Sequence, residues 1–379
     1  MSGKKNTAEL EVSIGEQEIA HRVIAETIRK KIFLGEYAPG DKLPSTVEIS
    51  ALWNTSKSTA HTALNRLVKE GLLERHHGSC TYVSEQRPSL DRIGIHYDSP
   101  HVWSDEERGF YRSLHGILEE KLKKAGIGIS VFVDRRPEAK QKSVLAEIRQ
   151  AIFTREIQGL IIPLSNSVNL PALRKLPLPV SVMTSELGLP NKVSFDDKKY
   201  FKEVLSRLAD KGCRSVGFIS SVDFDPDFPE QSQHAFHAED FIHEAEAHGM
   251  LTRNEWIRIP KKYVTQKARF GYREFHKLWK NTSLPEAVIV YPDNVVQGTI
   301  KAVLELGIHR NKDVTFCFHR NAHYDILCPF PALWTVSDEG KVADALLDQV
   351  YRQHQGKSVS PIRLPFDYRM ADSTVTIAD

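Results

Sequence analysis

The sequence predicts a small helix-turn-helix domain with a β-hairpin, followed by a larger α/β domain of two lobes. Within residues 14–84, apolar positions recur at helical spacing and two capping sequences mark helix starts. From Arg92 onward, apolar runs of strand length alternate with amphipathic stretches, which is typical of parallel sheets with helices on both faces. This second part is long for one such sheet, so we expect two lobes.

The chain of 379 residues divides into four expected segments. Its content of 41% apolar and 26% charged residues is that of an ordinary globular protein with a buried core. The linker segment is polar and contains proline, as connecting segments often do. The expected segments are a flexible tail at 1–13, the helix-turn-helix domain at 14–84, a linker at 85–91 and the α/β domain at 92–379.

The bulk composition excludes several classes of protein. The net charge of +2 is nearly balanced, so a nucleic-acid partner has to be argued from local features. The four cysteines have no regular spacing, which favours reduced thiols over a disulfide framework or a zinc site. The chain has neither an apolar run long enough to span a membrane nor a signal-peptide core at its start. We therefore expect a cytoplasmic protein without a metal, a cofactor or a membrane partner.

The elements of the first domain follow from caps and turns. Helical periodicity runs from Ile14 to Gly35. Ser45 and Glu48 have the spacing of a capping box, which predicts a short helix through Trp53. A second cap at Ser56 predicts a helix to about Glu70. Two short strands are then expected at 72–75 and 81–83, with the hairpin tip between them.

The second helix of this motif is free of negative charge at its start. No Asp or Glu occurs from Ile49 to Lys69. Hydroxyl groups, free backbone N–H groups and the positive end of a helix all favour phosphate, whereas an acid there would repel it. The plain alternative is that these Ser and Thr residues are only helix caps, and segment 14–84 holds almost as many acidic as basic residues. We predict DNA contacts from Ser45, Thr46, Ser56, Lys57, Ser58, Thr59, His61, Thr62 and Arg66.

The span from about His21 to Val83 resembles the winged-helix domain of the GntR family of bacterial repressors. The resemblance is carried by GEYAPGDKLPS (35–45), SKSTAHTAL (56–64), NRLVKEGLLER (65–75) and HGSCTYV (77–83). It implies that a recognition helix and the wing tip, His77, Gly78 and Ser79, grip DNA.

This sequence departs from the GntR pattern at several positions. The family usually has arginines where this chain has Val47, Lys57 and His61, and a wing glycine where it has Cys80. Lys57 keeps the charge but lacks the two-pronged geometry that arginine offers to guanine. We therefore expect an operator that differs from the common one of the family.

The α/β domain is expected to contain seven strands that alternate with seven helices. The strands are expected at 92–97, 128–133, 159–163, 179–183, 216–220, 287–291 and 314–318. The helices are expected near 106–125, 138–154, 197–211, 235–249, 266–281, 294–306 and 339–354.

Residues 92–379 resemble the sensor domain of LacI/GalR-type regulators, which has the periplasmic-binding-protein fold. The words that carry the resemblance include FYRSLHGILEEKLKKAG (110–126), VSFDDKKYFKEVLSRLADKGCRSVGFIS (193–220) and AVIVYPDNVVQGTIKAVLELG (287–307). A GntR-type DNA-binding domain joined to such a sensor domain is similar to the arrangement in arabinose repressors. The resemblance implies a dimeric repressor on a palindromic operator, released by a small metabolite in the cleft between the lobes.

The fold implied by this resemblance places ligand beside the carboxyl ends of strands. The residues that follow those strand ends supply aromatic rings for sugar rings and polar groups for hydroxyls. We predict ligand contacts from Tyr97, Asp98, Trp103, Phe110, Tyr111, Arg112, Ser165, Ser185, Asp223, His237, Asp293 and Arg320, with His101, Asn294, His319 and Asn321 as neighbouring candidates.

Two departures from the LacI pattern bear on the ligand. The sugar-binding arginine of the family falls close to His237, and its acid pair falls near Arg320 and Asn321. A site that has lost these groups and gained an arginine is a candidate for a sugar acid or a phosphorylated sugar, with Arg320 and Arg112 as an anion clamp. The effector is therefore expected to be a sugar or a sugar acid.

Two other functions compete with a transcription regulator. One is an α/β enzyme, such as a sugar-modifying enzyme or an aminotransferase-like domain, fused to the winged helix. The chain has no nucleophile elbow, phosphate-binding loop, dinucleotide fingerprint or zinc-protease motif, so we expect no enzyme. The other is a scaffold whose winged helix binds protein instead of DNA.

Overall fold

The computed structural model divides into two compact units, Met1–Leu90 and Asp91–Asp379. The expected tail and most of the expected linker lie outside the residues that the structure describes. The described residues are 20–29, 31–32, 36–76, 80–84, 89–97, 109–137, 140–164, 169–173, 175–184, 188–221, 238–260, 264, 266–281, 284–308 and 314–371.

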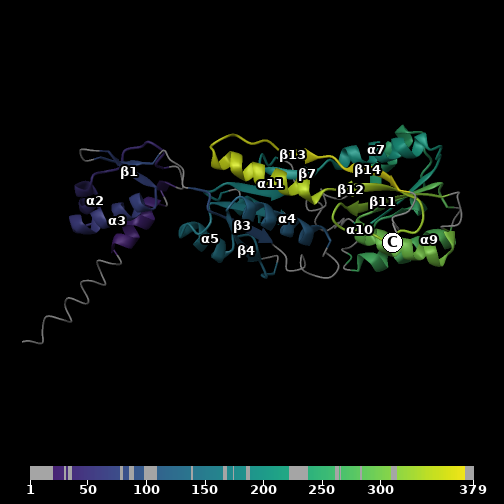
Figure 1. Ribbon diagram of the computed structural model, residues 1–379, viewed down its shortest axis with the longest axis horizontal. Coiled ribbons are helices and arrows are strands. Elements are labelled where there is room, and N and C mark those ends of the chain that lie inside the picture. The colour runs from purple at the N-terminus through teal and green to yellow at the C-terminus, as the bar shows by residue number, and fades with distance from the viewer. Residues whose placement is uncertain are drawn as a thin grey trace, which may run out of the picture. The chain divides into compact units, whose positions relative to one another are not determined.

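The first unit has the helices and the hairpin that the sequence predicts (Figure 1). Residues 20–29 are helical, and the turn between the next two helices contains Asn54, whose φ of 47° is tolerated by asparagine. The following elements are α2 (Thr46–Leu52), α3 (Lys57–Lys69), β1 (Leu73–His76) and β2 (Cys80–Val83). The two strands pair antiparallel with Leu73 opposite Val83.

Both predicted helix caps are confirmed. The Oγ atom of Ser45 accepts a hydrogen bond from the backbone N–H of Glu48 at 3.2 Å, and the Glu48 carboxylate accepts from the N–H of Ser45 at 2.6 Å. Ser56 caps α3 by accepting from the N–H of Thr59 at 3.0 Å. These caps satisfy backbone donors that the first turn of a helix leaves without partners.

Among the described residues, an apolar core and a buried ion pair hold the first unit together. The core packs α2, α3 and the hairpin around Ile24, Leu64 and Leu67. The side chain of Arg29 is only 4% exposed, and two of its three guanidinium nitrogens, Nε and Nη2, donate to the Glu70 carboxylate at 2.8–3.2 Å. Because Glu70 also accepts from Arg66 at 3.2 Å, the one acid at the end of α3 is neutralised within the unit.

The second unit contains two six-stranded sheets. The first has the order β13-β7-β6-β5-β3-β4 and the second the order β14-β12-β11-β10-β8-β9. Every pairing is parallel except that of β12 with β14. The strands are β3 (Arg92–Tyr97), β4 (Gly128–Val133), β5 (Gly159–Leu164), β6 (Val180–Met183), β7 (Lys192–Phe195), β8 (Val216–Ser220), β9 (Ile257–Arg258), β10 (Ala287–Tyr291), β11 (Thr315–Asn321), β12 (Ala332–Ser337), β13 (Ile362–Leu364) and β14 (Asp367–Ala371).

Helices cover both faces of each sheet, as alternation of strands and helices requires. The first sheet lies between α5 on one face and α4 with α11 on the other, and the second lies between α7 with α8 and α9 with α10 (Figure 1). The helices are α4 (Phe110–Lys124), α5 (Ala146–Phe153), α6 (Leu170–Leu173), α7 (Asp197–Asp210), α8 (Ala238–Ala247), α9 (Lys267–Asn281), α10 (Asp293–Glu305) and α11 (Glu339–His354).

The chain crosses from one sheet to the other at three places in the described part of the second unit. It leaves the first sheet after Phe195, returns to it after Ser337, and leaves it again after Leu364. As a result α11, which follows a strand of the second lobe, packs on the first: the amide of Gln353 bonds both backbone groups of Val180 at 2.7 and 3.3 Å. The two lobes are therefore joined by three crossing segments of the chain.

The structure corrects several sequence predictions. The helix expected at 138–154 starts only at Ala146, because Arg136 and Gln141 make hydrogen bonds that hold a loop before it. The strands β7, β9, β12, β13 and β14 and the short helix α6 were missing from the expected set of elements. Most of these strands are short or lie at sheet edges, so that their pairing depends on partners far away in the chain.

Candidate functional sites

The exposed face of α3 carries the residues that the sequence proposed for DNA. Lys57, Ser58, His61, Thr62 and Arg66 are all exposed, and α3 has no acid in its first turn. The spacing of these residues places them along one side of the helix, opposite the buried Ala60, Ala63, Leu64 and Leu67. The exposed side is therefore a polar and basic stripe.

Ser56 and Thr59, two of the proposed DNA contacts, form the cap of α3. Thr59 is buried, and its hydroxyl group lies 2.8 Å from the Oγ atom of Ser56. The hydroxyl group of Thr62 donates to the carbonyl oxygen of Ser58 at 2.9 Å. Ser45 and Thr46 lie at the start of α2, where Ser45 is exposed. The wing-tip residues His77, Gly78 and Ser79 lie outside the described residues.

Arg75 is a basic residue near this surface that the sequence analysis did not select. It lies on β1 and is exposed, and its guanidinium group is 3.5 Å from Nδ1 of His61. The contact joins the hairpin to α3 across 14 residues of sequence. Its place in a strand that leads to the wing tip was the signal that could have found it.

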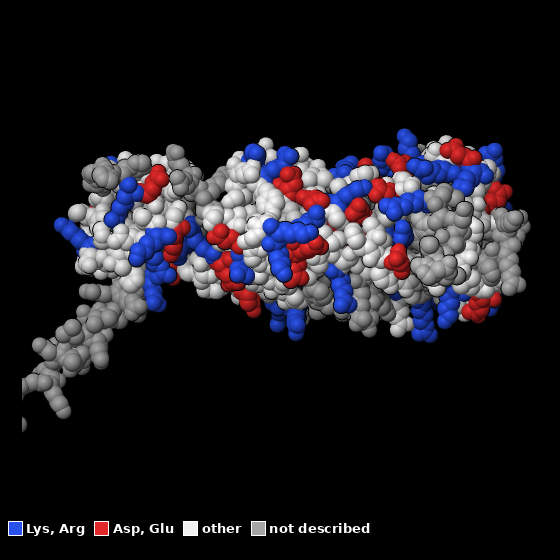
Figure 2. Space-filling view, viewed as in Figure 1, with Lys and Arg blue, Asp and Glu red and all other residues white. Residues whose placement is uncertain are grey.

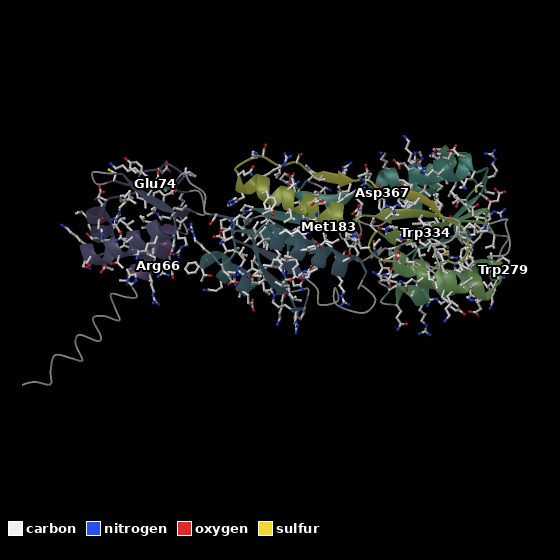
Figure 3. All side chains as sticks on the ribbon, in the orientation of Figure 1. Arg66, Glu74, Met183, Trp279, Trp334 and Asp367 are labelled. Carbon is white, nitrogen blue, oxygen red and sulfur yellow. The ribbon has the colours of Figure 1, made fainter. Side chains whose placement is uncertain are left out.

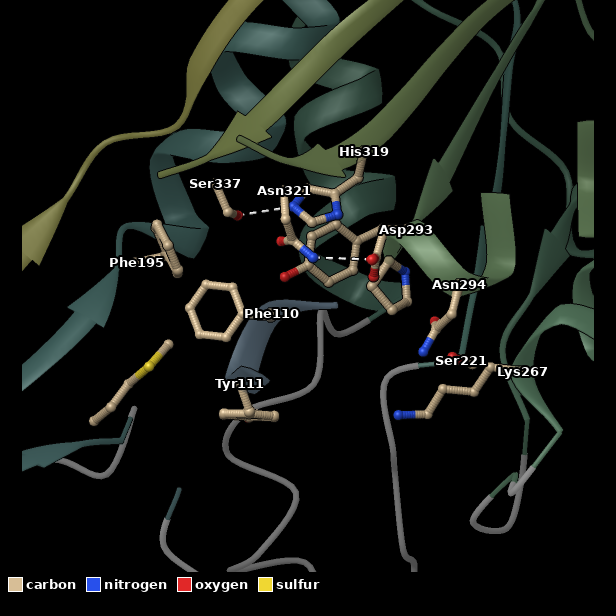
Figure 4. A pocket seen from close by; sticks show the side chains of 13 residues that line it. Phe110, Tyr111, Phe195, Ser221, Lys267, Asp293, Asn294, His319, Asn321 and Ser337 are labelled. Atoms are coloured by element: carbon tan, nitrogen blue, oxygen red, sulfur yellow. Dashed lines mark hydrogen bonds between the residues drawn. The ribbon is translucent and has the colours of Figure 1, made fainter. Parts of the chain in front are cut away.

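A pocket of about 220 Å³ lies between the two lobes of the second unit (Figure 4). It opens at the carboxyl ends of β8, β10, β11 and β12, where parallel sheets commonly bind ligands. The first lobe contributes Phe110, Tyr111, Met183 and Phe195 to its lining. The second lobe contributes Ser221, Lys267, Tyr291, Pro292, Asp293, Asn294, His319, Asn321 and Ser337.

His319 is the most deeply buried ionisable side chain of the pocket lining. Its Nε2 atom lies 2.7 Å from the Oγ atom of Ser337, and its ring packs on Tyr291 with centroids 4.4 Å apart. Its Nδ1 atom is buried and has no hydrogen-bond partner among the described residues. Burial lowers the pKa of His319 from 6.5 to about 3, so the imidazole is neutral at physiological pH. A neutral imidazole with one free nitrogen can bind a hydroxyl group.

Polar groups from other elements complete this part of the pocket. The amide Nδ2 of Asn321 donates to Oδ2 of Asp293 at 2.9 Å, which fixes the carboxylate beside the pocket (Figure 4). Ser221 is 1% exposed as a residue, and its Oγ atom has no hydrogen-bond partner among the described residues. A buried polar atom without a partner destabilises the folded state, and a ligand in the pocket can supply the missing bond.

Aromatic rings line the opposite side of the pocket (Figure 4). Phe110 contacts Phe195 with centroids 6.2 Å apart, and Phe195 stacks on Phe366 at 4.9 Å. Phe195 and Phe366 both lie where the chain crosses between the lobes. Figure 3 shows Met183 at the same boundary, whereas Trp279 lies far from it. The pocket is therefore polar on one side and aromatic on the other.

The proposed ligand residues fall into three groups. Phe110, Tyr111 and Asp293 line the pocket, together with the neighbouring candidates Asn294, His319 and Asn321. The structure places Tyr97, Arg112 and Arg320 elsewhere. Asp98, His101, Trp103, Ser165, Ser185, Asp223 and His237 lie outside the described residues.

The three residues placed elsewhere have other surroundings. Tyr97 is buried, with its hydroxyl group 3.0 Å from Nδ1 of His115, and Arg112 is exposed on α4. Arg320 pairs with Asp325 at 3.2 Å and lies 6.0 Å from the ring of Trp334. The anion clamp of Arg112 and Arg320 therefore remains a prediction that this arrangement does not favour.

The sequence analysis did not select seven of the lining residues. They are Met183, Phe195, Ser221, Lys267, Tyr291, Pro292 and Ser337. All but Lys267 end a strand or directly follow one. A search of every predicted strand end would have found those at β6, β8 and β10, but not Phe195 and Ser337, because β7 and β12 were not among the predicted strands. Lys267 starts a helix and carried no such signal.

Lowering the pH should destabilise the second unit partly through His319. The unfolded state binds a proton on this side chain below pH 6.5, whereas the folded state does so only near pH 3, so stability is lost as pH falls through this window. Between pH 6 and 4, the free energy of unfolding should therefore fall more steeply with falling pH in the wild-type protein than in His319→Asn. The difference in slope is at most about 1.4 kcal/mol per pH unit, the value for one proton. Urea unfolding at several pH values measures the slopes. Equal slopes for both proteins below pH 6 would contradict the assignment, and no difference is expected between pH 7 and 8.

Two family models match separate parts of the chain. Residues 20–83 match bacterial regulatory proteins of the gntR family. Residues 205–315 match a periplasmic-binding-protein-like domain. The chain joins a gntR-family helix-turn-helix domain to a periplasmic-binding-protein-like domain.

Two relatives match about three quarters of the chain at low identity. The chain is 23% identical over 314 residues to the arabinose metabolism transcriptional repressor of Halalkalibacterium halodurans, and the match covers 77% of each chain. It is 24% identical over 313 residues to the protein of the same name from Geobacillus stearothermophilus, covering 77% of this chain and 79% of the relative.

The gntR-family domain alone has a more similar relative. It is 41% identical over 71 residues to the mannosyl-D-glycerate transport/metabolism system repressor MngR of Escherichia coli. That match covers 19% of this chain and 30% of MngR, so it concerns the helix-turn-helix domain only.

Solved structures confirm the predicted fold of the second unit. The transcriptional repressor ascG of Escherichia coli superposes with a TM-score of 0.57 at 13% identity, covering 75% of this chain and 98% of ascG. The lac repressor dimer bound to operator and anti-inducer superposes with a TM-score of 0.58 at 14% identity, covering 75% and 94%. At such identity the likeness shows the fold: a two-lobed α/β domain of the periplasmic-binding-protein type.

Two further searches of the described residues concern other kinds of site. In that part of the chain, no helix combines the length and the apolar character needed to cross a bilayer. The same residues contain no group of three or more His, Cys, Asp or Glu side chains arranged to hold a metal ion.

Proposed function

We propose that this protein is a transcription regulator whose α3 face binds operator DNA and whose pocket binds a small effector that releases the operator. The observation that carries the proposal is the presence, on one chain, of an acid-free exposed helix in a gntR-family domain and a pocket with buried polar atoms that need partners. A DNA-binding domain and a metabolite-binding domain on one chain can act as a switch. A ligand that binds one conformation of the protein more tightly shifts the population toward that conformation.

The lining of the pocket favours a sugar-type effector. Aromatic rings such as Phe110 and Phe195 can stack on a sugar ring, and His319, Asp293 and Asn321 can exchange hydrogen bonds with its hydroxyl groups. The volume of about 220 Å³ lies below the ~300–1,000 Å³ of pockets for drug-sized ligands, which favours a monosaccharide. The names of two relatives that match 77% of this chain, repressors of arabinose metabolism, agree with this class.

Several further properties follow from this proposal. Repression is the expected sign of regulation, and a cytoplasmic homodimer on a palindromic operator is the expected working form, because two copies of a domain related by a two-fold axis match two half-sites. The relatives are transcription regulators, which supports a binding function over an enzymatic one.

The proposal is tested by selecting operator DNA and then adding sugars. The full-length protein is incubated with random-sequence duplexes, and the enriched sequence is used in binding assays at rising salt. We expect a palindromic sequence to be enriched and its affinity to fall steeply with salt, because bound lysine and arginine release counterions from phosphates. At least one sugar should weaken this binding. Failure to enrich any sequence would overturn DNA binding and favour the protein-binding scaffold.

A further inference from the structure

One corner of the pocket contains a lysine, and it lies opposite the aromatic side. Lys267, Asn294 and Ser221 lie together there, while Phe110 and Phe195 lie across the pocket (Figure 4). Lys267 is the first residue of α9, a helix of 15 residues. The N-terminus of a helix presents N–H groups and the positive end of the helix dipole, so it favours an anion.

A second helix also begins at this corner. α10 begins at Asp293, next to Asn294, and Pro292 before it provides no side-chain cap. The first residues of α9, a helix of 15 residues, and of α10, a helix of 13 residues, therefore both line the pocket. Asp293, the acid of the pocket lining, is held by the amide of Asn321 on the side away from Lys267 (Figure 4).

Ser221 is an independent sign that something binds in this corner. Its Oγ atom is buried and without a hydrogen-bond partner among the described residues, although the side chain lines the pocket. A hydroxyl group can donate to an anionic oxygen, and such charge-assisted hydrogen bonds are stronger than neutral ones. A carboxylate or phosphate oxygen beside Lys267 would satisfy Ser221 as well.

The charged side chains on the visible surface of the second unit would not attract an anion to the pocket from a distance. Figure 2 shows basic and acidic side chains interspersed over the visible face of the second unit, without one large patch of either sign. An anionic ligand would therefore be recognised inside the pocket, by groups that act at short range in a partly dehydrated site.

We propose that the pocket takes a monosaccharide-sized ligand with one anionic group, held by Lys267, Ser221 and the N-terminus of α9. Asp293, Asn321 and His319 then face the hydroxyl groups of the ligand, and Phe110 and Phe195 face its ring. This inference rests on the proposed function and narrows its effector class. It assigns the anion to Lys267 instead of to Arg112 and Arg320, neither of which lines the pocket.

The test compares sugar acids with their neutral parents on the full-length protein. Thermal shift and isothermal titration are run with D-galacturonate, D-gluconate and D-glucose 6-phosphate, and with D-galactose, D-glucose and L-arabinose. The variants are Lys267→Met, Lys267→Arg and the control Lys280→Met, which removes an exposed lysine from the other end of α9. The two carboxylates and the phosphate separate the two sources of negative charge.

We expect at least one anion to bind the wild-type protein more tightly than its neutral parent. Lys267→Met should weaken that anion roughly ten-fold to a hundred-fold, the range of a lost charge-assisted hydrogen bond. Lys267→Arg should retain most of the affinity, and Lys280→Met should retain all of it. Binding that weakens at high salt would agree with an ion pair.

Three results would overturn the inference. In the first, a neutral parent binds as tightly as its acid. In the second, Lys267→Met binds the anion as the wild-type protein does. Both would leave the proposed function standing, since a sugar would still bind the pocket. In the third, no anion of the panel binds, and the operator selection, run separately, then decides whether DNA binding survives.

Discussion

Replacing Gly298 with alanine is expected to lower the free energy of unfolding of the second unit by about 3 kcal/mol or more. Gly298 lies in α10, where a Cβ atom would overlap the carbonyl oxygen of Ala268 and lie 2.6 Å from its carbonyl carbon. Both atoms belong to the backbone of α9, so only a shift of the whole helix relieves the overlap. The two helices are close-packed against one core, which resists such a shift.

The same substitution should weaken effector binding. Ala268 is adjacent to Lys267, and α10 begins at Asp293, so a shift of one helix against the other moves two groups of the pocket apart. Gly271 makes the reciprocal approach: a Cβ atom there would overlap the carbonyl oxygen of Val295 and lie 2.9 Å from its Cγ1 atom. The close contact of α9 with α10 is thus a condition for the geometry of the pocket.

The matched control is Gly116→Ala. Gly116 lies in α4, and a Cβ atom there meets no atom within 4 Å. This substitution should leave stability unchanged or raise it by about 0.5–1 kcal/mol, because alanine favours the helix and restricts the unfolded chain. Urea unfolding of the full-length protein measures both variants. A midpoint for Gly298→Ala equal to that of the wild-type protein would contradict the close contact.

Reversing the charge of Lys57 is expected to reduce operator affinity roughly a hundred-fold. Lys57 is the first residue of α3 and is exposed, in a turn without an acid. A glutamate there would place a negative charge beside phosphates or base edges and would lose a cationic contact. Fluorescence anisotropy with the selected operator, at several salt concentrations, measures the affinity and its salt dependence.

Lys69→Glu is the matched control for this variant. It makes the same change of charge at the exposed last residue of the same helix. Because recognition helices contact bases mainly with their N-terminal residues, we expect only a few-fold loss. Lys57→Arg should keep or improve the affinity of the wild-type protein. Equal losses of operator affinity for Lys57→Glu and Lys69→Glu would show that α3 contributes only positive charge and no position-specific contact.

The elements that could be predicted from the sequence are those specified by neighbouring residues. The capping box of Ser45 and Glu48 and the cap at Ser56 act across three residues, and both are confirmed. Apolar runs such as 216–220 and 287–291 are buried on both faces of a sheet, and the structure has strands β8 and β10 there. The short edge strands β9, β13 and β14 were not predicted, because they have no such run.

The candidate pocket was predictable to the extent that its residues follow strands. Asp293 follows β10 and Asn321 ends β11, so their places at one sheet edge could be inferred from a parallel order of strands. Lys267 could not be inferred in this way, because it reaches the pocket only through the close crossing of α9 and α10. Arg320 was selected by its neighbours in sequence, but successive side chains of a strand point to opposite faces.

By itself, the sequence determined most of the longer helices and strands, where α3 begins, and that α3 is free of acids from its start to Lys69. These properties depend on interactions between residues close along the chain. Only the tertiary structure decided that His319 meets Ser337, that Asn321 holds Asp293, and that Lys267 and Ser221 share one corner. Those pairs come from different strands and helices, so their meeting depends on sheet order and on how closely two helices can approach.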